Sequence, residues 1–177
     1  MRIDLSPLAT GKTQEISFEY RMESDPGLIF EHLRPTESRP ILGSGTISKS
    51  GRRFLLKLTY AGSVTVPCDR CLEPFSYAFD GTLVRLLEKG DPGHAESDED
   101  EDAEEIVAVA GDSVELDPLV ADDILLDLPL RMLCREACAG LCQKCGQNLN
   151  TGSCACELDT VDPRLAALQE LLKSKEV

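Results

Sequence analysis

The chain has no tryptophan, few other aromatic residues and only two histidines. Aromatic residues make up 5% of its 177 residues, and the histidines are His32 and His94. Hydrophobic residues reach 42%, so a core can form, but it must be mainly aliphatic. The sequence also lacks a P-loop, a G-x-S-x-G turn and a dinucleotide fingerprint. We therefore expect both histidines to be ordinary surface or packed residues, and the protein not to be an enzyme.

Basic residues are also scarce. There are 18 lysines and arginines against 32 aspartates and glutamates, which gives a net charge of −14. A chain this acidic repels phosphate backbones, so the balance argues against non-specific nucleic-acid binding unless basic residues cluster. It favours partners that are basic proteins.

Long apolar runs are missing as well. The first twenty residues contain no secretory signal, and the most apolar stretch, "LVADDILLDLPL", is interrupted by three aspartates. We therefore expect no membrane association and a cytoplasmic location, where thiols stay reduced.

Alternating apolar residues predict β-strands through the first half of the chain. "TQEISFEY" has the pattern of one strand, and "GSGTISKSGRRFLLKLTY" predicts a hairpin that turns at Ser50–Gly51. "GSVTVPC" and "FSYAFDGTLVRLLEK" continue the alternation, the latter with Phe75, Tyr77 and Phe79 on one face. We expect three or four antiparallel strands between residues 41 and 89, with "CDRC" on a connection between two of them.

The second half mixes an acidic block with two helical patterns. Eight acidic residues between Glu96 and Glu105 predict a mobile acidic loop at about 91–105. "EEIVAVAGDSVEL" returns to strand character. Residues 117–128 predict a helix with Asp117 as its cap and Pro118 at its first position. The stripe expected to face the sheet is Leu116, Val120, Ile124 and Leu128, flanked by Leu119 and Leu125. "DPRLAALQELLKSK" predicts a C-terminal helix.

These elements predict an α+β fold. We expect an antiparallel twisted sheet or small open barrel with a packed helix, followed by a Cys-rich zinc-binding tail and a C-terminal helix. The predicted division is a body over 1–133 and a tail over 134–177.

Eight cysteines are the one chemically distinctive feature. Disulfides are disfavoured by the expected reducing location and by a chain long enough to form a core. Cys138, Cys142 and Cys145 have the C-x3-C-x2-C spacing of some iron–sulfur sites, although only thirty-two residues follow. "CDRC" resembles a redox pair, with Arg70 to lower the thiol pKa, but it runs into Pro74 and a β pattern rather than a helix.

Zinc fits the spacing best. A C-x2-C turn grips one tetrahedral ion with two thiolates, and a second pair completes the site. The predicted zinc ligands form two structural sites of four cysteines each, a local one of Cys142, Cys145, Cys154 and Cys156 and a long-range one of Cys68, Cys71, Cys134 and Cys138. A single site with free cysteines elsewhere is the alternative.

The motifs "CDRCLEPF", "LPL", "C-x-G-L-C-x-x-C-G-x-N-L-N", "C-x-C" and "DPRLAAL" resemble the bacterial YceD family of large ribosomal RNA subunit accumulation proteins. The resemblance covers residues 60 to 172 and is most specific over 129–170. It implies a non-enzymatic ribosome biogenesis factor that promotes synthesis, processing or stability of large-subunit rRNA. It implies no catalytic residues.

The implied partner is a ribosomal protein or a pre-ribosomal particle of the large subunit. Direct RNA contact stays open, through basic residues on the hairpin or near the cysteine tail: Lys49, Arg52, Arg53, Arg131, Arg135 and Lys144. The alternative function is a thiol-disulfide oxidoreductase that uses Cys68 and Cys71.

Overall fold

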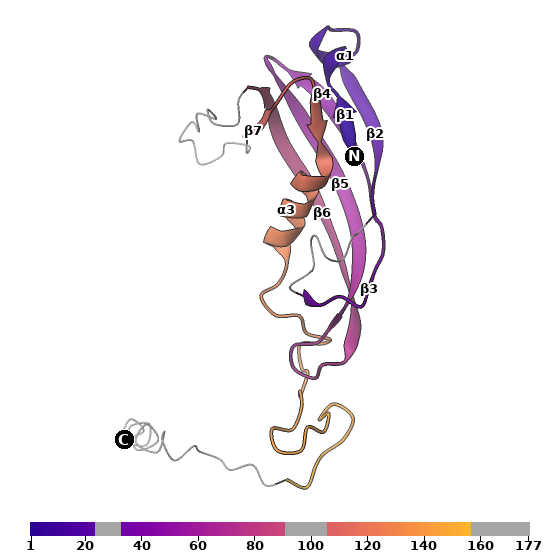
Figure 1. Cartoon of the computed structure of the whole chain (residues 1–177), viewed down its shortest axis with the longest axis vertical. Coiled ribbons are helices and arrows are strands. Elements are labelled where there is room, and N and C mark those ends of the chain that lie inside the picture. The colour runs from indigo at the N-terminus through magenta and orange to yellow at the C-terminus, as the bar shows by residue number, and fades with distance from the viewer. Residues whose placement is uncertain (24–32, 91–105, 157–177) are drawn as a thin grey trace, which may run out of the picture.

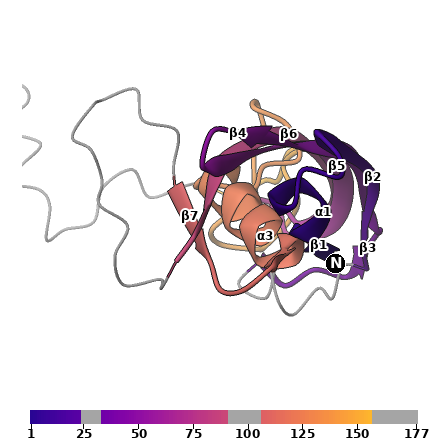
Figure 2. The ribbon, with the colours of Figure 1, turned by 90° about the horizontal axis from the view of Figure 1, so that it is seen from above.

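The computed structural model describes residues 1–23, 33–90 and 106–156. A long, strongly curved sheet dominates this part of the chain, and two helices, α1 and α3, lie inside its curvature (Figures 1 and 2). The predicted acidic loop, the C-terminal helix and both histidines lie outside the described residues.

The main sheet follows the predicted β pattern. Its path runs β2 (Glu15–Met22), β4 (Ile41–Ser50), β5 (Arg53–Pro67), β6 (Pro74–Lys89) and β7 (Ile106–Val109), and the short β3 (Glu37–Ser38) pairs with β5. All of these pairings are antiparallel except that of β6 with β7, which is parallel. The sheet is open rather than closed into a barrel. A mainly antiparallel sheet with helices packed on it confirms the expected α+β fold.

The β4–β5 hairpin turns where the sequence predicts it. Ser50 pairs with Arg53, and Gly51 takes the positive φ of 61° that the two-residue turn requires. "GSVTVPC" is not a separate strand, because β5 runs unbroken to Pro67 and pairs with β6 as far as Pro67–Pro74. This long pairing carries the "CDRC" connection to the far end of the sheet (Figure 1).

Alternation along the strands directs one face of the sheet into the core. Buried side chains of β4, β5 and β6 on that face include Ile47, Leu56, Leu58, Leu83 and Leu87. Glycines on the same face make room for aromatic rings: a Cβ at Gly45, Gly62 or Gly81 would lie within 2.7 Å of Phe18, Phe79 or Tyr60, respectively. Aromatic rings therefore cover the glycine positions, and the face stays smooth enough to receive a helix.

Helix α3 (Leu116–Asp127) covers this face at the position predicted for 117–128. Leu116, Val120 and Ile124 are buried, as the helical spacing predicts, but Leu125 is 40% exposed. Asp117 is not the cap: the N-cap is Glu115, which makes no side-chain cap hydrogen bond. The Asp117 carboxylate instead accepts bonds from the Met1 ammonium and, at 3.0 Å, from the Tyr20 hydroxyl.

The N-terminus is tied to the start of α3. Strand β1 (Arg2–Asp4) pairs with β8 (Ser113–Glu115) in a separate two-stranded sheet, and the four-residue α1 (Ser6–Ala9) places Leu8 in the core. A second polar link lies under α3, where Tyr60 donates to Asp123 at 2.8 Å and Arg85 to the same carboxylate at 3.1 Å. Both links fix how α3 lies on the sheet.

Candidate metal centre

The first C-x2-C turn forms the connection between β5 and β6. The Cys68 N–H donates to the Glu73 carbonyl at 2.9 Å, and the Leu72 N–H donates to the Cys68 carbonyl at 2.9 Å. Leu72 has a φ of 60°, a conformation that non-glycine residues rarely adopt. The turn places Cys68 and Cys71 in the protein interior, 0% and 4% exposed.

The second C-x2-C turn repeats this geometry. The Cys142 N–H donates to the Gln147 carbonyl at 2.8 Å, and the Gly146 N–H donates to the Cys142 carbonyl at 2.9 Å. Gly146 has a φ of 73° and is the counterpart of Leu72. A bridge between Leu141 and Asn148 closes the second turn at its base. The two sequence repeats are therefore the same structural unit, used twice.

The eight thiols gather in two groups of four. Within each group the sulfur atoms all lie within 4.8 Å of one another. We name the group of Cys68, Cys71, Cys134 and Cys138 cluster 1, and the group of Cys142, Cys145, Cys154 and Cys156 cluster 2. This grouping is the one that the spacing predicted; that the groups bind a metal stays a prediction.

The sulfur spacing of cluster 1 suits a tetrahedral ion. Four thiolates at about 2.3 Å from one zinc ion would stand about 3.8 Å from one another. The Cys68 and Cys138 sulfurs are 3.8 Å apart, and those of Cys71 and Cys134 are 3.7 Å apart. Donor type, donor number and spacing therefore all fit a structural zinc site.

Backbone N–H groups prepare one thiol of each cluster to be a thiolate. Burial alone would raise the pKa of the Cys68 thiol, but N–H groups of Cys134, Cys71 and Arg70 lower it to about 6. The N–H groups of Cys145 and Lys144 likewise lower the pKa of the Cys142 thiol to about 6. Thiolates are the form that binds metal, so both turns favour the ligand state.

Cys134 and Cys156 show the cost of crowding four sulfurs together. Burial and the neighbouring Cys138 thiol raise the pKa of the Cys134 thiol to about 12. The Cys145 thiol, followed by burial, raises the pKa of Cys156 to about 12. Four negative sulfurs repel one another without a cation between them, and a bound divalent cation removes that repulsion.

Cluster 1 joins segments that are more than sixty residues apart in sequence. Asp69 and Met132 exchange two bonds, from the Asp69 N–H to the Met132 carbonyl at 2.8 Å and from the Met132 N–H to the Asp69 carboxylate at 2.7 Å. The Arg70 guanidinium donates to the Cys138 carbonyl at 2.9 Å. Both contacts hold the segment that follows α3 against the β5–β6 connection.

Asn150 connects the two clusters, and the cysteine spacing does not predict this role. It belongs to the loop of cluster 2, yet its side-chain N–H donates to the Cys138 sulfur of cluster 1 at 3.3 Å. Its side-chain oxygen accepts from the Ala139 N–H at 2.8 Å and from Arg135 at 2.6 Å. The hydrogen bond from the Asn150 side chain lowers the pKa of the Cys138 thiol. The residue type in "QNLN" could have indicated such a contact, because an asparagine side chain offers both hydrogen-bond donors and an acceptor.

The structure also bears on the other cysteine chemistries. The C-x3-C-x2-C spacing does not form one site, because Cys138 lies in cluster 1 and Cys142 and Cys145 lie in cluster 2. The Arg70 guanidinium contacts a carbonyl, so the charge that suggested a redox pair is directed elsewhere. Cys68 is fully buried, which leaves it poorly placed to attack a substrate disulfide.

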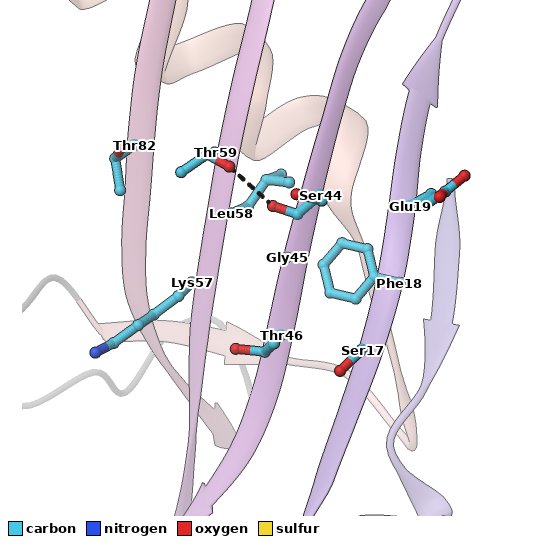
Figure 3. A pocket seen from close by; sticks show the side chains of 10 residues that line it. All are labelled: Ser17, Phe18, Glu19, Ser44, Gly45, Thr46, Lys57, Leu58, Thr59 and Thr82. Carbon is cyan, nitrogen blue, oxygen red and sulfur yellow. Dashed lines mark hydrogen bonds between the residues drawn. The ribbon is translucent and has the colours of Figure 1, made fainter.

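The outer face of the sheet offers a second surface but no comparable chemistry. A shallow trough of about 650 Å³ crosses β2, β4, β5 and β6 on this face, and half of its lining residues are serine or threonine. Figure 3 shows the side chains that line it. Glu19 and Lys57 are its only charged residues, and Thr59 donates to the Ser44 carbonyl at 3.2 Å. Scattered hydroxyls of this kind form no acid–base pair and no ligand set.

The sequence is similar to a known protein family and to several individual proteins. Residues 56–172 match the family described as large ribosomal RNA subunit accumulation protein YceD. An uncharacterized protein of Bacillus subtilis, YlbN, is 28% identical over 138 residues, 77% of each chain. An uncharacterized protein of Mycobacterium tuberculosis is 31% identical over 115 residues, 63% of this chain and 54% of that protein.

A maize protein named large ribosomal RNA subunit accumulation protein YCED homolog 1, chloroplastic, is 29% identical over 163 residues, 76% of this chain and 55% of that protein. The chain thus spans about half the length of several of these relatives. No solved structure matches it. None of the described helices is long and apolar enough to cross a membrane. The family match covers well over half of the chain and includes both C-x2-C turns, so the chain belongs to the YceD family.

Proposed function

We propose that the chain is a non-enzymatic ribosome biogenesis factor that promotes the accumulation of large-subunit rRNA. Family membership is the observation that carries this proposal, because the family model and the maize relative are both named for that role. The acidic composition supports an indirect action on RNA, through a basic ribosomal protein or a pre-ribosomal particle. The proposed location is the cytoplasm.

Two structural zinc ions are part of the proposal. Each cluster supplies four thiols, and a set of four cysteine ligands leaves no coordination position for water or substrate. The division into a body over 1–133 and a tail over 134–177 gives cluster 1 two ligands from each part. Zinc at cluster 1 would then hold the tail on the body.

The test is the ratio of large- to small-subunit rRNA in cells depleted of the protein. We expect the ratio to fall, wild type to restore it, and Cys68→Ser to restore it incompletely. Metal analysis of the purified wild-type protein should find two zinc ions per chain. An unchanged ratio in depleted cells would sink the proposal.

The oxidoreductase alternative is tested on the same protein. A thiol-disulfide oxidoreductase needs Cys68 or Cys71 to react with an alkylating reagent in the native state. Bound zinc and burial should instead protect both residues, so that they react only after denaturation in a chelator. Rapid native alkylation of Cys68 would favour the alternative.

A further inference from the structure

Exposed leucines gather at the end of α3. Among the described residues, six large apolar side chains are exposed, and three of them lie within six positions: Leu125 at 40%, Leu126 at 79% and Leu130 at 104%. Single exposed leucines are ordinary, whereas a cluster of them beside a cleft indicates a surface that something covers.

A cleft lies at the same end of α3, between the helix and β6, although Leu125, Leu126 and Leu130 do not line it. It holds about 280 Å³, and the residues that line it are Tyr60, Tyr77, Ala78, Phe79, Asp80, Ile124, Asp127 and Leu128. The rings of Tyr77 and Phe79 are stacked, with centroids 6.4 Å apart and planes inclined by 27°, so the cleft has an aromatic wall. No lysine or arginine lines the cleft, and two aspartates do.

The charge of α3 itself has one sign, and the exposed Arg131 follows Leu130 shortly after the helix. Helix α3 carries four aspartates and no basic residue. Asp117 is held by Met1 and Tyr20, and Asp123 by Tyr60 and Arg85. Asp122 and Asp127 are exposed on the helix, whereas the exposed Asp80 alternates with Phe79 and so faces the outer side of β6. An apolar surface among exposed carboxylates is complementary to a segment that presents both apolar and cationic side chains.

We propose that this surface docks a basic, amphipathic segment of a protein partner. A lysine or arginine of that segment enters the cleft, where its charge meets Asp127 and its stem lies against Tyr77 and Phe79. Apolar residues of the same segment cover Leu125, Leu126 and Leu130. The inference rests on the proposed function and makes it more specific: the direct partner is a basic protein, because phosphates are repelled by this surface.

Photo-crosslinking in the full-length chain tests the surface directly. Benzoylphenylalanine replaces Leu126, and in the matched control it replaces Leu42. Leu42 is 53% exposed and lies on the outer face of β4, opposite to the face that buries Ile41. Each protein is mixed with the proteins of purified large ribosomal subunits freed of rRNA, and separately with the protein-free rRNA. We expect position 126 to crosslink to a lysine- or arginine-rich protein segment at least about tenfold more than position 42.

The charges are tested in the same assay. Asp122→Asn combined with Asp127→Asn should lower the crosslinking yield at position 126 several-fold, and the loss should match that caused by high salt in the parent protein. Crosslinks that go chiefly to rRNA, to residues 157–177 of the same chain or to a second copy would overturn the proposal, as would equal yields at positions 42 and 126.

Rescue in depleted cells separates this inference from the proposed function. Leu126→Ser with Leu130→Ser should fail to restore the large- to small-subunit rRNA ratio, while Leu42→Ser restores it like wild type. Full rescue by the double variant would overturn the docking surface and leave the proposed function standing. A ratio that depletion never changes would instead overturn the function, on which the docking partner depends.

Discussion

The two cysteine clusters contain the same turn in different surroundings. In cluster 1 three of the four cysteines are buried, and the ligands come from the β5–β6 connection and from the segment that follows α3. In cluster 2 only Cys142 is buried, Cys145 is exposed, and all four ligands lie within fifteen residues. Cluster 1 therefore closes a long loop onto the body, whereas cluster 2 organises a short stretch of its own.

This difference predicts different consequences for folding. A cross-link between distant segments removes much more freedom from the unfolded chain than one within a short segment. A ligand set in the interior also leaves unpaired thiols buried when the metal is lost. We therefore expect cluster 1 to be coupled to the stability of the sheet, and cluster 2 to form and open locally.

The largest effect should come from removing one ligand of each cluster. Cys68→Ser should lower the free energy of unfolding of the metal-loaded protein by on the order of 4 kcal/mol. Cys145→Ser should lower the free energy of unfolding of the sheet by less than about 1 kcal/mol, because the loss of metal at cluster 2 affects only its own loop. Denaturant titrations followed by tyrosine fluorescence report on the body alone, since the three tyrosines, Tyr20, Tyr60 and Tyr77, all lie in the sheet. Equal losses in the two variants would contradict the contrast.

Metal removal should separate the clusters in time. A chelator is expected to take the metal of cluster 2 roughly ten times faster or more, because that site opens without unfolding the sheet. Alkylation during chelation, mapped by mass spectrometry, should label Cys145, Cys154 and Cys156 before Cys68 and Cys71. If the two sets were labelled together, the clusters would open as one unit.

The sequence predicted the features that are local and missed those that depend on distant contacts. The hairpin at Gly51, the strand pattern and the buried positions of α3 follow from side-chain alternation and helical spacing. The parallel pairing of β7 with β6 and the pairing of β1 with β8 have no local signal, because register over long separations depends on the whole sheet.

The candidate site divides in the same way. The two C-x2-C turns and the grouping of the thiols could be predicted, because ligand spacing and complete use of eight cysteines leave few arrangements. Asn150 could not, because its contact with Cys138 exists only when the loop of cluster 2 folds back. Asp117 was misassigned as a cap because a nearby ammonium and a tyrosine hydroxyl, both brought in by other strands, take its carboxylate.

Asn150 offers a more selective change, since it belongs to one cluster in sequence and contacts the other. Asn150→Ala should weaken metal binding at cluster 1 by about tenfold, the usual effect of removing a bond to a ligand atom. Gln147→Ala is the matched control, because the Gln147 side chain contacts its own loop, through Ser153. The readout is metal competition in the Cys145→Ser background. An unchanged metal affinity at cluster 1 in Asn150→Ala would show that the contact carries no coupling.

The smallest effects, with opposite signs, are expected at the residue that follows each C-x2-C pair. Leu72 and Gly146 occupy equivalent positions with φ of 60° and 73°, but only glycine adopts that conformation without cost. Gly146→Ala should therefore weaken metal binding at cluster 2 several-fold. Leu72→Gly relieves about 1 kcal/mol of backbone strain in the folded state. Glycine also gives the unfolded chain more conformational freedom, which offsets part of this gain. The free energy of unfolding should therefore stay constant or rise slightly. Thermal unfolding of the metal-loaded protein measures this. A clear loss of stability in Leu72→Gly would mean that the Leu72 side chain, 64% exposed, stabilises cluster 1 by a contact that outweighs its strain.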